Sequence, residues 1–72
     1  MTENILIFAS VHVALCGEKA LKAEQVEHQV VPVPPYVNEG CGIGIKVEQN
    51  ILTAALAVLA RKEIKVEQVV TT

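Results

Sequence analysis

The chain has 72 residues, of which 51% are hydrophobic, and a formal net charge of −2. Acidic and basic residues are interspersed, so electrostatics gives no reason to expect nucleic acid or an anionic membrane as a partner. The longest apolar stretch, residues 51–60, is too short to span a bilayer.

A domain of this size buries only about 60% of the surface that its unfolded chain exposes, so it is marginally stable alone. We therefore expect a homodimer or a larger partner. The first residues lack the basic segment and cleavage site of a signal peptide. Two cysteines without such a signal indicate free thiols in a reducing compartment, and we expect a cytoplasmic protein.

The first half of the chain is predicted to form a strand, a helix and a second strand. Residues 4–9 contain a short apolar run that is typical of a central strand. Ser10 can cap a helix over residues 11–24. Residues 26–33 are β-branched and polar by turns, and Pro32 makes them an edge strand. The apolar face of the helix consists of Val13, Ala14, Gly17, Ala20 and Leu21.

The second half is predicted to form a turn, a strand, a helix and a last strand. Residues 34–42 have turn composition, and residues 43–47 alternate in the manner of a strand. Asn50 can cap the second helix, and residues 64–71 alternate as a half-exposed strand. The buried stripe of this helix consists of Leu52, Ala55, Leu56 and Leu59.

Further apolar residues lie off the main stripe of the second helix. A dimer contact through this helix or through the sheet is one interpretation, and helix propensity of alanine is the other. These residues are Ile51, Ala54, Ala57, Val58 and Ala60.

The order β-α-β-β-α-β predicts the fold class. It favours an α+β, ferredoxin-like βαββαβ sandwich, with a four-stranded antiparallel sheet and both helices on one face. We expect residues 1–72 to form this one domain. A faint internal repeat supports it, because Leu21 precedes Val26 by the same interval as Leu59 precedes Ile64.

Cys41 is the strongest candidate for chemistry because Gly40 and Gly42 flank it just past a proline-rich bend. Glycine on both sides lets the backbone turn sharply and leaves the sulfur with little cover. The alternative interpretation is that Cys41 is a small hydrophobic residue closing a tight turn.

The predicted topology brings Cys41 close to Ser10 and His12. The first and third strands are adjacent, and the loop before the third strand lies at the end of the sheet where the first helix begins. The N–H groups of a helix start favour a thiolate over a thiol and can hold a small anion. His12 could orient or protonate a sulfur-bound species, or it is an exposed residue without a role.

Other residues have simpler interpretations. Cys16 lies beside the buried stripe and is expected to pack there, and His28 is expected to be solvated on an edge strand. No CxxC motif is present, so dithiol redox and metal-chaperone sites lack their ligands. Two cysteines and two scattered histidines make a poor zinc site, so we expect no metal and no bound cofactor.

Several stretches of the first 47 residues together resemble the DUF3343 family of small bacterial selenium/sulfur carrier-like proteins. The resemblance implies a ferredoxin-like domain whose cysteine, matched by Cys41, carries selenium or sulfur as a persulfide-type adduct. Ser10 and His12 match a Ser-Thr-His segment of the family. The chain departs from the family pattern at Val11, Pro35 and Glu39. The resembling stretches are FASVHVAL at 8–15, EKALK at 18–22, VPVP at 31–34 and CGIGIK at 41–46.

Three functions remain open from the sequence. The first is a carrier, not an enzyme, in which Cys41 holds sulfur or selenium for transfer between a donor and an acceptor protein. The second is a dimeric module that binds a small anion or regulates a partner without covalent chemistry. The third is a structural interaction domain that uses the apolar second helix.

Overall fold

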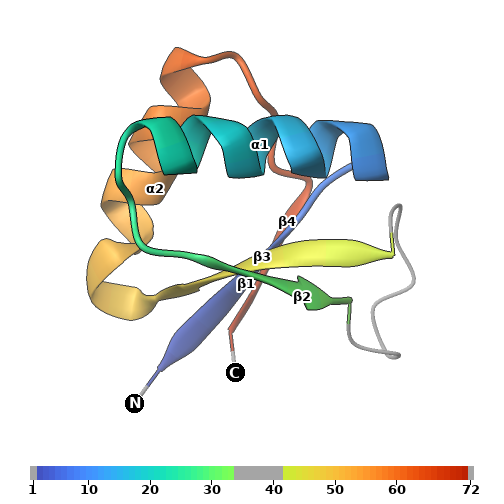
Figure 1. The fold of residues 1–72 in the computed structure, drawn as a ribbon. Helices are drawn as coiled ribbons and strands as arrows, with labels where there is room; N and C mark the ends of the chain where they lie inside the picture. The colour runs from blue at the N-terminus through green and yellow to red at the C-terminus, as the bar shows by residue number, and fades with distance from the viewer. Residues whose placement is uncertain (1, 34–41, 72) are drawn as a thin grey trace.

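The computed structural model describes residues 2–33 and 42–71 of the chain, and these form four strands and two helices (Figure 1). Their order matches the predicted β-α-β-β-α-β pattern. In chain order they are β1 (Glu3–Ile7), α1 (Val11–Ala23), β2 (Gln29–Pro32), β3 (Ile43–Glu48), α2 (Gln49–Arg61) and β4 (Gln68–Thr71).

The strands form one sheet in the order β2-β3-β1-β4, and each neighbouring pair is antiparallel. β3 therefore lies between the two strands that α1 connects, and β1 lies between the two that α2 connects. Both helices cover the same face of the sheet (Figure 1). These features confirm the predicted α+β, ferredoxin-like fold. Pro32 lies in β2, an edge strand, as its missing N–H group requires.

The core lies between the sheet and the helices. The predicted apolar face of α1 is confirmed, since Ala14, Gly17, Ala20 and Leu21 are buried. The prediction for α2 is wrong at Val58, which is buried, whereas Leu52 and Leu56 are only half-buried. Apolar residues surround much of this helix, so packing rather than pattern sets its rotation. The sheet contributes Leu6, Ile45 and Val47 to the core, Phe8 follows directly after β1, and α2 contributes Ala55, Val58 and Leu59.

Both helices end in the same backbone motif. Gln25 N–H donates to Lys22 C=O at 3.1 Å, and Val26 N–H donates to Leu21 C=O at 2.9 Å. Gln25 takes the left-handed conformation, with φ of 58°. α2 repeats this pattern at Glu63. The internal repeat of the sequence therefore corresponds to two Schellman motifs, in which an apolar pair, Leu21 with Val26 or Leu59 with Ile64, closes the helix.

Replacing Gln25 by glycine is expected to raise the free energy of unfolding by about 1 kcal/mol relative to Gln25→Ala, since a left-handed residue with a Cβ costs about 1–2 kcal/mol. Urea denaturation followed by circular dichroism measures the difference. Equal stabilities of the two variants would contradict the assignment of Gln25 as the left-handed residue that closes α1.

Three element starts differ from the sequence prediction by more than one residue. β2 and β4 begin at Gln29 and Gln68, because Val26 and Ile64, the first residues of the predicted strands, bond to the helix ends instead. Asn50 does not cap α2: Glu48 holds the N-cap position without a side-chain bond, because β3 runs directly into the helix. The N–H of Gln49 donates instead to Thr2 C=O at 3.1 Å.

Asn4 is a buried polar residue that joins three elements, and its exposed fraction is 1%. Its Nδ2 donates to Gln49 Oε1 at 2.9 Å, and its Oδ1 accepts from Thr71 Oγ1 at 2.9 Å. These bonds satisfy the buried amide and connect β1 to α2 and β4 at the end of the sheet away from the start of α1.

Candidate functional site

Ser10 caps the start of α1, as predicted. Its backbone is extended, with φ of −153°, and its Oγ accepts a hydrogen bond from Val13 N–H at 3.2 Å. The first turn of α1 contains no acidic residue, so no carboxylate there neutralises the partial positive charge of the helix start. This end of the helix therefore favours a negatively charged group nearby.

The start of β3 lies at the same end of the sheet as the start of α1 (Figure 1). Ile7, the last residue of β1, is opposite Gly44 near the beginning of β3. Gly42 C=O accepts a hydrogen bond from Val33 N–H at 3.2 Å, which extends the pairing of β2 with β3 toward that end. The starts of α1 and β3 therefore lie at one end of the sheet, which is the arrangement of elements that the site prediction requires.

Gly42 belongs to the segment before β3 that contains Cys41, whereas Gly40 and Cys41 themselves lie outside the described residues. Gly42 is exposed, and a Cβ placed on it would meet no atom within 4 Å. Its φ is not in the left-handed region. At this position glycine is therefore required neither by the backbone conformation nor by a close neighbour.

His12 lies on the exposed side of α1 and faces Cys16. Cys16 is exposed, so the prediction that it packs in the core is wrong. The two residues are one helical turn apart, which brings Cys16 Sγ to 3.9 Å from His12 Nε2. The spacing of four residues is the sequence signal for this pair, which the predicted placement of His12 beside Cys41 does not include.

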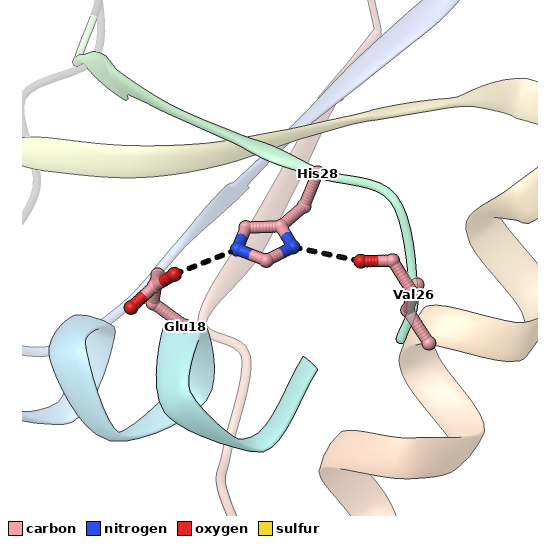
Figure 2. A network of polar contacts seen from close by, with 3 residues as sticks. All are labelled: Glu18, Val26 and His28. Atoms are coloured by element: carbon pink, nitrogen blue, oxygen red, sulfur yellow. Dashed lines mark hydrogen bonds and ion pairs between the residues drawn. The ribbon is translucent and has the colours of Figure 1, made fainter. Parts of the chain in front are cut away.

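His28 is held by two oxygen atoms and is not a solvated residue, contrary to the prediction (Figure 2). Its side chain is 11% exposed. Its Nε2 lies 2.9 Å from Glu18 Oε2 and its Nδ1 lies 2.8 Å from Val26 C=O. Both partners are acceptors, so both contacts are hydrogen bonds only when both ring nitrogens carry a proton. The pair ties α1 to the segment that leads into β2.

A surface hollow of about 310 Å³ lies at the opposite end of the sheet from Ser10. It is rich in carboxylates, and an ion pair within its lining joins Lys46 Nζ to Glu3 Oε1 at 3.6 Å. No group of three or more metal-ligating side chains occurs among the residues that the structure describes. None of the helices described is long and apolar enough to cross a membrane. The hollow is lined by Glu3, Glu27, His28, Gln29, Lys46, Val47 and Glu48.

One family of known proteins matches the chain over nearly its whole length. The family model described as "Putative Se/S carrier protein-like" matches residues 3–71. No curated protein and no solved structure matches the chain. The matched span contains every strand and helix from β1 to β4 and both cysteines.

Proposed function

Because the chain belongs to the family of Se/S carrier-like proteins, we propose that it holds a sulfur or selenium atom as a persulfide-type adduct on Cys41. The observation that carries the proposal is the shared sheet end of α1 and β3. β3 begins two residues after Cys41, and the start of α1 at that end has no acidic residue in its first turn. A thiolate near such a helix start is stabilised by the helix dipole and by unpaired N–H groups.

The transfer step needs no oxidant or reductant beyond the donor. The Cys41 thiolate attacks the terminal sulfur of a donor persulfide, and a bond forms between Sγ and that sulfur. The sulfur–sulfur bond of the donor breaks, and its electron pair leaves with the donor thiolate. An acceptor thiolate reverses the step at the same atom.

Ser10, His12, Gly40 and Gly42 complete the proposed site. The Ser10 hydroxyl oxygen accepts the cap bond, and its proton remains available to an anion at the helix start. His12 would orient or protonate a sulfur-bound species. The two glycines would leave the sulfur open to a partner, and the open space around Gly42 agrees with this role.

Partner proteins supply the donor and the acceptor in this proposal, because the transfer step is an exchange between the thiolates of two proteins. Val11 and Leu15 are 45% and 48% exposed, one turn apart near the start of α1. Exposed apolar side chains beside the proposed site favour protein contact there. A homodimer stays a prediction from chain size.

Alkylation at acidic pH tests the proposal. In a Cys16→Ser variant Cys41 is the only thiol, and its reaction with iodoacetamide at about pH 6 is compared with that of free cysteine, whose pKa is about 8.5. A helix start lowers the pKa of a nearby cysteine, so Cys41 is expected to react faster than the free amino acid. Equal rates would favour the second function, a module that binds an anion without covalent chemistry.

A further inference from the structure

The exposed side of α1 carries two metal-ligating side chains in contact. Cys16 Sγ lies 3.9 Å from His12 Nε2, and both residues are exposed. This pair depends only on residues of one regular helix and uses none of the loop that precedes β3.

The separation of the two atoms fits chelation of one cation. Bonds of about 2.1 Å to imidazole nitrogen and about 2.3 Å to thiolate sulfur, at a tetrahedral angle, place the two ligand atoms about 3.6 Å apart. The observed 3.9 Å needs a shift of a few tenths of an ångström, which exposed side chains make without moving the helix. We propose that His12 Nε2 and Cys16 Sγ together bind a zinc-type divalent cation, a role beyond the proposed carriage of sulfur or selenium.

The donor set selects the class of metal. Thiolate and imidazole suit zinc and other thiophilic ions and disfavour magnesium and calcium. Binding releases one proton from the Cys16 thiol, and His12 ligates through Nε2 with its proton on Nδ1. No third side-chain ligand gathers with these two in the part of the chain described, so the remaining positions are left to water.

Cadmium titration tests the chelate, with Cd²⁺ as the optical probe for zinc. The chain carries Cys41→Ser, so that the ultraviolet band of thiolate-to-cadmium charge transfer reports Cys16 alone. We expect the band to saturate at one Cd²⁺ per chain, and excess Zn²⁺ to abolish it. His12→Asn is expected to raise the dissociation constant about tenfold or more, since even changes outside the ligand shell cost about 10–100-fold in metal affinity.

A register control separates chelation from the mere presence of a histidine. The variant His12→Asn with Lys22→His keeps the number of histidines but places the ring away from Cys16 on the helix. We expect no recovery of affinity in this variant. Each of four results would overturn the proposal. They are recovered affinity in this variant, a change below tenfold in His12→Asn, saturation at half a Cd²⁺ per chain, and failure of Zn²⁺ to displace Cd²⁺. Circular dichroism checks that every variant keeps its helices.

Discussion

Serine in place of Cys41 is expected to reduce sulfur loading about tenfold or more, whereas serine in place of Cys16 is expected to preserve it. The proposed adduct forms by attack of a thiolate, and serine offers no nucleophile of comparable strength at neutral pH. The assay mixes each variant with one equivalent of glutathione persulfide, removes the small molecules, and measures protein-bound sulfur as thiocyanate after cyanide treatment.

The Cys16→Ser variant is the matched control, because Cys16 is exposed and its replacement leaves the core unchanged. Equal loading of the wild type and the Cys41→Ser variant would exclude Cys41 as the carrier thiol. Loss of loading in Cys16→Ser alone would move the carrier role to α1.

Alanine in place of Gly44 is expected to lower the free energy of unfolding by about 1–3 kcal/mol, the usual cost of overpacking. A Cβ on Gly44 would lie 2.8 Å from Ile5 Cγ2 and 3.0 Å from the Leu6 carbonyl oxygen. The carbonyl belongs to the paired backbone of β1, and Ile5 is 7% exposed, so neither neighbour can move freely. Denaturant unfolding followed by circular dichroism measures the loss.

Gly42→Ala is the control for this effect. Gly42 lies two residues away in the same segment, but a Cβ there meets no atom within 4 Å and its φ is not left-handed. Replacing such a glycine by alanine reduces the entropy of the unfolded chain, so this variant is expected to gain about 0.4–1 kcal/mol. Equal stabilities of Gly42→Ala and Gly44→Ala would show that the close approach at Gly44 does not constrain the sheet.

The fold could be predicted because its signals are periodic and local. The apolar run of β1 and the alternation of β3 identify the central strands, and Pro32 identifies an edge. The rotation of α2 could not be predicted, because its apolar residues surround much of the helix and packing selected Val58. The strand starts were placed too early because the left-handed residues that close the helices, Gln25 and Glu63, are not glycines and carry no turn signal.

Two structural features around the candidate site could be predicted. The N-cap at Ser10 and the common sheet end of α1 and β3 follow from capping chemistry and strand order, and the structure has both. The surroundings of Cys16 and His28 could not be predicted, because a position at the edge of a helical stripe or before a strand does not fix exposure. For His28 the deciding contact is with Glu18, on a different element.

The mass of the chain isolated from cells without reductant is the most direct test of covalent carriage. We expect a fraction of the protein to be heavier by one sulfur or one selenium atom, with the addition on the peptide that contains Cys41 and its removal by dithiothreitol. A chain that is unmodified throughout, or modified only at Cys16, would contradict the account.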